Sequence, residues 1–402
     1  MNQTLGYGYP SSVAPCAGRI VDVDGHEWLP PELWVEEFGE VVRPMAELAE
    51  EMLQSQRTAY FKDSLIEQTD ELNPNSVWKT KGPWAPGAYD MSRRLDVLDY
   101  TGVRSQLVFP GTLALYACFM HGFADDPTLF SKIPGDRREY AATLLRAYNN
   151  WVIRKSGISS RLRLVAALVA PSPEELIGEA RRLIEAGVRA VWLPSSILPG
   201  DRSPAHNDLD PFWDLCSRTD TIVTLHIGNE PGFYKTLRWR EAKAFEGWKV
   251  ATEINADPWT LVTQPVPSQN YLTAMVTGAV FERHPRLRLG VIELGADWIG
   301  PLAYRLDMWY RHSQFKKWNE LLSRPPSEYI RENVRVSAYP FEQIDEYIQK
   351  FGLEEIYCYA SDFPHVEGGT SPMSFWAERL ARLGPGMLEK FFVTNGQFLV
   401  PD

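Results

Sequence analysis

Short β-rich runs alternate with amphipathic stretches along almost the whole chain, and this alternation limits the possible folds more than any other feature. The eight runs cover residues 19–26, 103–110, 163–170, 188–194, 221–227, 287–293, 334–339 and 356–362. Stretches with helical periodicity lie between them. This order is typical of parallel βαβ units. Because eight strands with intervening helices favour a closed barrel over an open doubly wound sheet, we predict an α/β fold of the (β/α)₈ TIM-barrel type.

The length of the chain is compatible with more than one arrangement of domains. Its 402 residues fit two or three ordinary domains, or one barrel of about 250 residues with insertions. We expect an N-terminal arm at residues 1–18 and a single barrel domain at residues 19–402. Two long insertions, at about residues 28–90 and 228–267, follow the first and fifth predicted strands. Since barrels build active sites at the carboxyl ends of their strands, both insertions are expected to cover the active-site face.

Tryptophan is concentrated in these two insertions. Of the 14 tryptophans, the insertions hold Trp28, Trp34, Trp78, Trp84, Trp239, Trp248 and Trp259. One interpretation is a surface excursion with its own small core, and the other is an aromatic wall and lid over a pocket. The position of the insertions favours the second. The predicted pocket residues are Trp28, Trp84, Trp239, Trp248 and Arg238.

Charge and targeting signals exclude several classes of protein. Lys and Arg number 41 against 52 Asp and Glu, so the net charge of −11 argues against binding to nucleic acid. The N-terminus does not resemble a signal peptide, and no run approaches the roughly 20 apolar residues of a membrane span. We therefore expect a cytoplasmic protein. The four scattered cysteines lack the C-x-x-C spacing of a thiolate zinc site or a disulfide framework.

The first predicted strand carries two acids and a histidine at alternate positions. Asp22, Asp24 and His26 share one side of an extended segment, and in a barrel that side can face the interior. Buried aspartates are costly unless they receive hydrogen bonds or a cation. A capped strand end has the same pattern, so the motif alone leaves a structural and a functional interpretation open.

Three further strand ends carry groups of the same kind. His226 lies at the end of the fifth run, Glu293 at the end of the sixth, and Asp362 and His365 flank Phe363-Pro364 at the end of the eighth. Each has a simple alternative, a hydrogen-bonded structural histidine or a salt bridge. If the barrel closes, however, the ends of four strands bring these groups to one pocket, and that is the arrangement of a metal site.

These motifs resemble the amidohydrolase superfamily, in the branch that contains aminocarboxymuconate semialdehyde decarboxylase and the resorcylate-type decarboxylases. The resemblance extends over about residues 19–400. It is carried by D-x-D-x-H on the first strand, the strand end at His226, the stretch FERHPRLRLGVIELGADWIGPL, the element ASDFPH and the terminal VTNGQFLV.

The resemblance implies a divalent metal held by Asp24, His26, His226 and Asp362. The chain departs from the family pattern because Asp24 replaces the first histidine of an H-x-H pair and Glu293 replaces a sixth-strand histidine. The fourth strand also lacks a residue that bridges two metals. Added carboxylates shift the expected metal from Zn toward Fe or Mn. Glu293 is either a general base or a ligand of a second ion, so one or two ions per chain remain open.

The leading functional expectation is a hydrolase that uses metal-activated water on an acyl derivative (amide, ester or thioester) of a bulky apolar acid. Asp362, Glu293 and His365 are its expected catalytic residues. The alternative is metal-dependent non-oxidative decarboxylation of an aromatic or unsaturated acid, with an arginine such as Arg93, Arg94, Arg238, Arg240 or Arg305 as the anchor of the anion. The resemblance implies that a sixth-strand histidine assists this reaction, and Glu293 at that position counts against it. A non-catalytic binding barrel ranks last, because every implied ligand position keeps a residue able to bind metal.

The expected partners are a small apolar acyl or aryl substrate and a second copy of the chain. The resemblance implies a homo-oligomer, and we expect a homodimer. No contact with nucleic acid or membrane is expected, because the acidic net charge disfavours both anionic surfaces.

Overall fold

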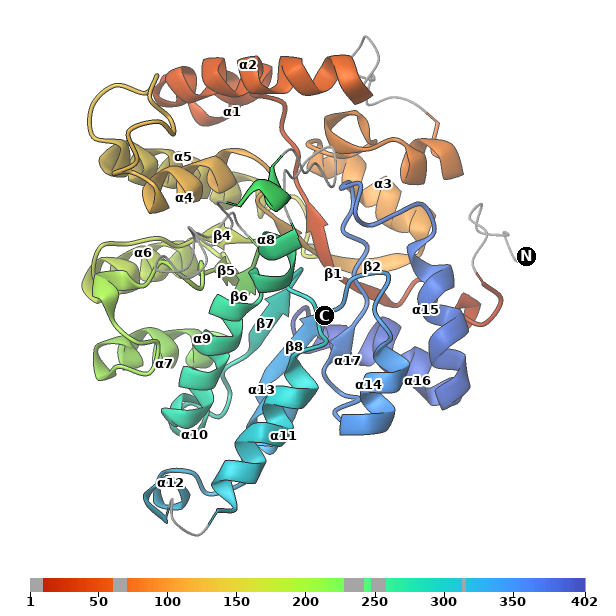
Figure 1. Ribbon diagram of the computed structural model, residues 1–402. Coiled ribbons are helices and arrows are strands. Elements are labelled where there is room, and N and C mark those ends of the chain that lie inside the picture. Colours follow the sequence, from red (N-terminus) through yellow and green to blue (C-terminus); the bar gives the residue numbers. More distant parts are fainter. Residues whose placement is uncertain (1–9, 61–70, 228–241, 247–257, 313–315, 402) are drawn as a thin grey trace.

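The strands of the computed structural model run parallel and form two neighbouring sheets (Figure 1). The structure describes residues 10–60, 71–227, 242–246, 258–312 and 316–401. The first sheet has the order β1 (Ile20–His26), β2 (Val103–Phe109) and β3 (Leu162–Leu164). The second contains, in order, β4 (Ala166–Ala167), β5 (Ala190–Trp192), β6 (Ile222–His226), β7 (Leu289–Ile292), β8 (Val334–Ser337) and β9 (Tyr357–Cys358).

The third predicted strand is divided into β3 and β4 by Val165. The Val165 N–H donates to Val108 O in β2 at 2.9 Å, and the Leu168 N–H donates to Trp192 O in β5 at 2.9 Å. The two sheets are therefore continuous through this segment. Asn149 explains why β4 is so short, because its side-chain amide bonds both the N–H (3.0 Å) and the C=O (2.9 Å) of Ala167.

The last strand returns to the first and closes the barrel. The Val23 N–H donates to Tyr359 O at 3.0 Å, and the His26 N–H donates to Phe363 O at 2.7 Å. Gly25 and Phe363 also form a parallel bridge. The predicted (β/α)₈ barrel is confirmed, with strands shorter than the predicted runs.

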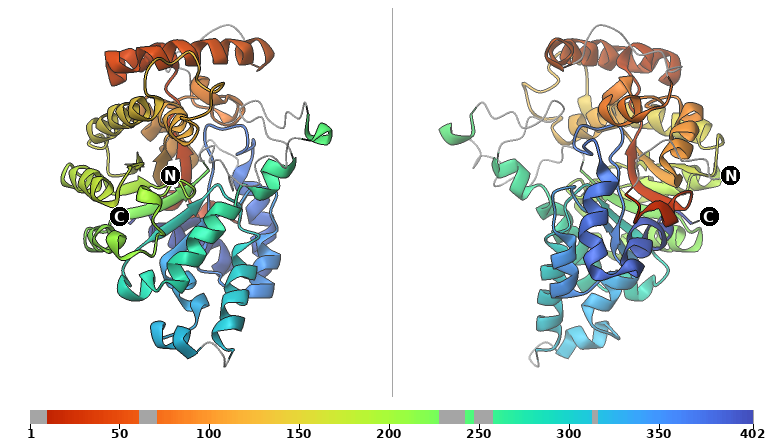
Figure 2. Two further views of the ribbon diagram at one scale, coloured as in Figure 1. Left: turned by 60° about the vertical axis from the view of Figure 1, so that its left-hand side comes forward. Right: turned by 90° about the vertical axis from the view of Figure 1, so that its right-hand side faces the viewer.

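Helices alternate with the strands and lie outside the sheets (Figure 2). The long connecting helices are α3 (Met91–Thr101), α5 (Arg137–Lys155), α6 (Pro173–Glu185), α7 (Asp210–Arg218), α9 (Val266–Thr277), α11 (Ile299–Tyr310), α13 (Pro326–Asn333), α14 (Ile344–Phe351) and α15 (Pro372–Leu380). Further helices are α4 (Leu113–Gly122), α8 (Pro258–Thr263), α10 (Val280–Arg283), α12 (Lys316–Leu321), α16 (Pro385–Glu389) and α17 (Asn395–Gln397). Among the helices of the described ranges, none is both long and apolar enough to cross a membrane.

The insertion after β1 contains two helices and a small core of its own. Helix α1 (Trp34–Phe38) packs against α5, and α2 (Arg43–Tyr60) lies farther out, at the top of Figure 1. The small core includes Trp28, Val77 and Trp78, and Phe363 from the turn after β9 packs into it. This core joins the insertion to the end of the barrel at which the strands finish. Of the second insertion, residues 228–241 and 247–257 lie outside the described part of the chain.

Candidate metal centre

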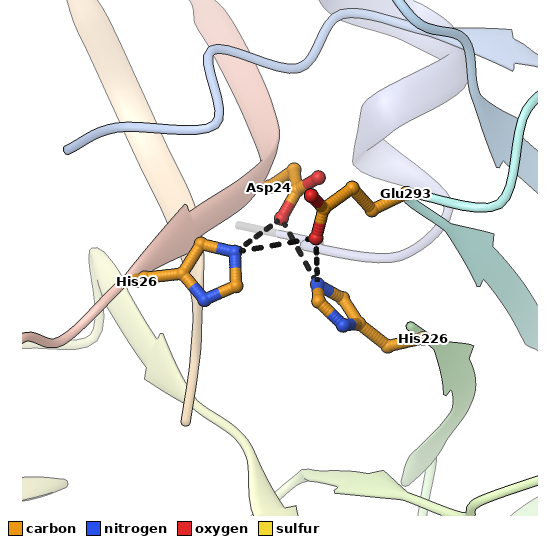
Figure 3. A group of neighbouring side chains, drawn as sticks. All are labelled: Asp24, His26, His226 and Glu293. Atoms are coloured by element: carbon orange, nitrogen blue, oxygen red, sulfur yellow. Dashed lines mark ion pairs between the residues drawn. The ribbon is translucent and has the colours of Figure 1, made fainter. Parts of the chain in front are cut away.

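The acids and histidines predicted from the strand ends meet at the carboxyl ends of the strands. Asp24 and His26 alternate on β1 and so point to the same side, and His226 is the last residue of β6. Glu293 follows β7 directly (Figure 3). Asp362 and His365 lie in the turn after β9. The structure brings all six of these side chains together, in two overlapping groups that share His26 and Glu293.

The spacing of their donor atoms suits a metal ion. Asp24 Oδ1 lies 3.3 Å from His26 Nε2 and 3.5 Å from His226 Nε2. Glu293 Oε2 lies 3.3 Å from His226 Nε2 and 3.8 Å from His26 Nε2. Asp362 Oδ1 is 3.4 Å from His26 Nε2. Two donors bonded to one tetrahedral ion at about 2.1 Å lie about 3.4 Å apart, so these separations match those of ligands around one ion.

These same donor atoms lack hydrogen-bond partners in the described part of the chain. Asp24 Oδ1, His26 Nε2, His226 Nε2, Glu293 Oε2 and Asp362 Oδ1 are all buried, and none makes a hydrogen bond with any described residue. Buried polar atoms without partners are rare, because each costs its full desolvation energy. A divalent cation bound by the two imidazoles and the two aspartates would satisfy four of these atoms, and a proton on Glu293 would satisfy the fifth, so the residues present fit a metal ion.

The two imidazoles are oriented by carbonyl groups. His26 Nδ1 lies 3.3 Å from Pro110 O, and His226 Nδ1 lies 2.6 Å from Ile227 O. A carbonyl can only accept, so each Nδ1 carries the proton and donates it. When neutral, each imidazole would present the lone pair of Nε2 to a metal, which is how histidines that bind metals are held.

Glu293 and Asp362 have an unusual backbone conformation. Their φ angles are 54° and 52°, in the left-handed region that disfavours residues with a Cβ. Ser337 Oγ accepts from the Glu293 N–H at 2.8 Å, and the Tyr339 hydroxyl donates to Glu293 O at 2.9 Å. The Asp362 N–H donates to Asp24 O at 2.8 Å. Such strain is kept only where neighbouring groups enforce it, and it is concentrated at functional sites.

Burial and mutual repulsion perturb the acids of the centre. Burial, together with the charges of Asp362 and Asp24, raises the pKa of Glu293 well above its usual value. Burial also raises the pKa of Asp362 to about 7, with a further contribution from Asp24. Burial lowers the pKa of His365 well below its usual value, and the nearby His26 and His226 lower it further. A bound cation would relieve the mutual repulsion of these buried carboxylates.

Aromatic rings enclose the centre. His365 stacks on His26 with 4.0 Å between ring centroids, and Trp28 meets His365 edge-on at 4.9 Å. On the other side, Phe109 stacks on His226 at 4.2 Å. Of the predicted pocket residues, Trp28 therefore lies beside the centre, whereas Trp84 is buried within the insertion near Gly82. Trp239, Trp248 and Arg238 lie outside the described residues.

Of the five arginines expected to anchor an anion, the structure rules out Arg94. Arg94 is fully buried, and its guanidinium donates to backbone carbonyls, including His26 O at 2.6 Å. It is therefore unavailable to a substrate. Arg93 pairs with Asp96 on α3, and Arg305 is exposed on α11. Arg240, like Arg238, lies outside the described ranges.

Several residues at the centre were missed from the sequence. Glu367 lies two residues after His365, and both of its carboxylate oxygens are buried without a hydrogen bond from any described residue. Its charge also contributes to the raised pKa of Asp362. The sequence could have indicated Glu367, because this acid lies so close to the ASDFPH element. Ser337 and Tyr339 gave none, because their role depends on contacts between strands.

A closed parallel barrel with imidazoles and carboxylates at its carboxyl end is the architecture of a metal-dependent barrel enzyme. The family model described as Amidohydrolase matches residues 122–397, more than half of the chain. The chain therefore belongs to the amidohydrolase family, as the sequence motifs indicated.

Solved structures resemble this chain over nearly its whole length. An amidohydrolase from Mycobacterium avium subsp. paratuberculosis has 18% identity and a TM-score of 0.66, covering 95% of this chain and 99% of its own. A 5-carboxyvanillate decarboxylase from Novosphingobium aromaticivorans, complexed with manganese and 4-hydroxy-3-methoxy-5-nitrobenzoic acid, has 16% identity and a TM-score of 0.57, covering 100% and 97%. A dihydroxybenzoic acid decarboxylase from Polaromonas, with manganese and 2-nitroresorcinol, has 13% identity and a TM-score of 0.56, covering 95% and 96%.

Proposed function

We propose that the protein is a metal-dependent, non-oxidative decarboxylase of an aromatic carboxylic acid. The observation that carries the metal centre is the convergence of five buried donor atoms that make no hydrogen bond with any described residue. The donor atoms form two overlapping groups that share His26 and Glu293, so the two groups belong to one site. We therefore propose one ion per chain.

The proposed ligands are Asp24, His26, His226 and Asp362. Their mixture of carboxylate and imidazole favours Mn²⁺ or Fe²⁺ over Zn²⁺, and the manganese in similar solved structures supports Mn²⁺. When bound, the ion supplies positive charge that orients the acid and stabilises negative charge developing during the reaction.

Glu293 is the proposed proton donor. An aromatic carboxylate loses CO₂ when its ring carbon takes a proton, so ArCOO⁻ and H⁺ give ArH and CO₂. Glu293 Oε2 lies at the centre, and in the metal-free protein burial raises the pKa of this carboxyl well above its usual value, which favours its protonated form. The ring carbon receives that proton as its bond to the carboxyl carbon breaks. A proton from solvent then restores Glu293.

The surrounding side chains keep water out and orient the reacting groups. Glu293 and Asp362 are each only 7% exposed, and the other proposed ligands are less exposed. Trp28 and Phe109 present aromatic surface on either side of the histidines. His365 stays neutral, because its pKa is lowered, and its Nδ1 lies 3.4 Å from Asp362 Oδ1. It is therefore placed to orient this carboxyl.

Acyl hydrolysis, the leading expectation from the sequence, is less well supported than decarboxylation. The similar solved structures include decarboxylases of aromatic acids bound to manganese, and this supports the alternative. The limited exposure of the centre also fits a reaction that requires a proton and no attacking water.

A direct assay of both reactions tests the proposal. The manganese-loaded protein is incubated separately with a panel of carboxylated phenols and with aryl esters and thioesters. Release of CO₂ and the decarboxylated phenol is measured beside release of free acid from the esters. We expect CO₂ from at least one aromatic acid. Hydrolysis of the acyl compounds without any CO₂ would overturn the proposal.

A further inference from the structure

We propose that Asp22 is a positioning residue that fixes Asp24 and Asp362 relative to each other. The inference rests on the proposed metal centre, because these two acids are among its proposed ligands. Asp22 precedes Asp24 on β1, where the register with β2 shifts between Asp22 and Gly25, and it is not part of either group of donor atoms. It lies in a separate, buried hydrogen-bond network behind the centre.

Each oxygen of the Asp22 carboxylate accepts two hydrogen bonds, and the donors lie on β1, on β2 and in the turn after β9. Asp22 Oδ1 accepts from the Asp24 N–H at 3.2 Å and from the Ser361 N–H at 2.9 Å. Asp22 Oδ2 accepts from the Ser361 hydroxyl at 2.5 Å and from Gln106 Nε2 at 2.7 Å. Asp22 is only 1% exposed, so these four bonds replace the water that the group loses on burial. The carboxylate thereby joins β1 to the turn after β9.

The network also requires an acceptor on both oxygens of residue 22. Arg94 Nη1 donates to Gln106 Oε1 at 2.9 Å, and a guanidinium has only donors. Gln106 must therefore direct its NH₂ group at Asp22 and cannot be turned around. An asparagine at position 22 would place one NH₂ group against another, or against the Ser361 N–H.

Gly25 provides the space for this arrangement. A Cβ at Gly25 would lie 2.4 Å from Gln106 Nε2 and 2.6 Å from its carboxamide carbon. Because Arg94 and Asp22 hold both ends of that amide, Gln106 cannot move aside cheaply. The glycine between Asp24 and His26 is therefore what lets Gln106 reach Asp22.

Ser361 transmits the network to Asp362. The N–H and the hydroxyl of Ser361 both donate to Asp22, and Ser361 Oγ accepts from the Phe363 N–H at 3.2 Å. The backbone is thus held on both sides of Asp362, whose φ of 52° costs energy. Without these bonds, the turn can relax to an ordinary backbone conformation. The Asp362 carboxylate would then leave the position that faces His26.

Metal affinity tests the inference. The dissociation constant of Mn²⁺ is measured by calorimetry for the wild-type apoprotein, Ser361→Ala and Asp22→Asn. Loss of a group that orients a metal ligand typically weakens binding about 10- to 100-fold, and we expect this for both variants. The matched control is Asn149→Ala, which removes two buried hydrogen bonds to β4, a strand without a residue of the centre. It should lose stability and keep wild-type affinity.

Rescue distinguishes positioning from a general loss of structure. Asp22→Asn combined with Gln106→Glu exchanges donor and acceptor, because the new amide at position 22 donates to the new carboxylate at position 106. The Ser361 hydroxyl, which donates to the same oxygen of Asp22, can turn to Asp24 O, 3.4 Å away. The other oxygen of that carboxylate still accepts from Arg94. We expect the double variant to bind Mn²⁺ more tightly than Asp22→Asn alone. If Asp22→Asn does not fold, Ser361→Ala decides the question.

The outcomes separate this inference from the proposed function. Wild-type affinity in both Ser361→Ala and Asp22→Asn overturns the positioning role while leaving the metal centre intact. A wild-type protein that binds no Mn²⁺ overturns the metal centre itself. Weakening in Ser361→Ala that the Asn149→Ala control shares to the same degree also contradicts the inference, since the loss would then be structural.

Discussion

Glu293 and Asp362 each combine a strained backbone with a buried carboxyl. Both have left-handed φ angles, and burial raises the pKa of both. The strain is balanced by hydrogen bonds from neighbouring strands, whereas the electrostatic cost calls for a cation. At the scale of single residues, the centre thus combines backbone strain with buried carboxyl groups, and contacts with the rest of the barrel hold both in place.

The role of Glu293 can be separated from that of a metal ligand. Glu293→Gln keeps the size of the side chain but cannot donate a carboxyl proton. We expect the rate of CO₂ release to fall about 100- to 10,000-fold, the usual contribution of a general acid, with manganese content unchanged. Metal analysis accompanies the kinetics. Loss of manganese would show that Glu293 is a ligand, and a wild-type rate would exclude it as the donor.

Metal affinity should depend on pH because of Asp362. Its pKa is raised to about 7 by burial, so below about pH 7 the metal-free protein holds a proton on this carboxyl. The ion must displace that proton. We expect Mn²⁺ affinity to fall as pH drops below about 7, by up to about tenfold per pH unit for each proton displaced. Calorimetry across this range measures it, and affinity that does not change with pH would contradict the assignment.

Single residues also show what the sequence can and cannot predict. The alternation of Asp24 and His26, and their meeting with His226, Glu293 and Asp362, followed from the rule that barrel strands end at one face. The network around Asp22 did not follow, because Gln106 on β2 and Ser361 in the turn after β9 are distant from it in sequence. Left-handed φ angles at acids leave no mark in the residue pattern.

At the scale of elements, the periodicity of the sequence predicted where the strands lie but not which groups bond to their backbones. Residues 163–170 read as one strand, yet Asn149 of α5 takes both backbone groups of Ala167 and shortens the ladder. The insertion after β1 was described by two competing interpretations, and the structure shows the small core that the first one predicts. It has its own core, and Trp28 of that core also touches His365.

Two helix glycines should respond in opposite ways to alanine. Gly300 in α11 faces Phe351 of α14, and a Cβ there would lie 2.6 Å from the Phe351 ring. Gly300→Ala should therefore lower the free energy of unfolding by about 1–3 kcal/mol. Gly178 in α6 is exposed with open space around it, so Gly178→Ala should raise it by about 0.5–1 kcal/mol. Denaturant unfolding checks both, and equal effects would contradict this account of helix packing.

At the scale of the whole molecule, barrel closure creates the centre. Only when the turn after β9 returns to β1 does Asp362 reach within 3.4 Å of His26 Nε2. The net charge of −11 counts every acid of the chain and does not reveal that several of them are gathered inside the barrel. Those acids make binding of a cation favourable, so the ion should stabilise the folded barrel by mass action.

The most direct test of the central claim is the number of metal ions bound per chain. The purified protein is stripped with a chelator, reloaded with Mn²⁺, freed of excess ion and analysed for metal and protein. One ion is expected per chain, together with a higher unfolding temperature than that of the stripped protein. Protein that binds no Mn²⁺, Fe²⁺ or Zn²⁺ after reloading, or that binds two ions, would contradict the single centre proposed from the five converging atoms.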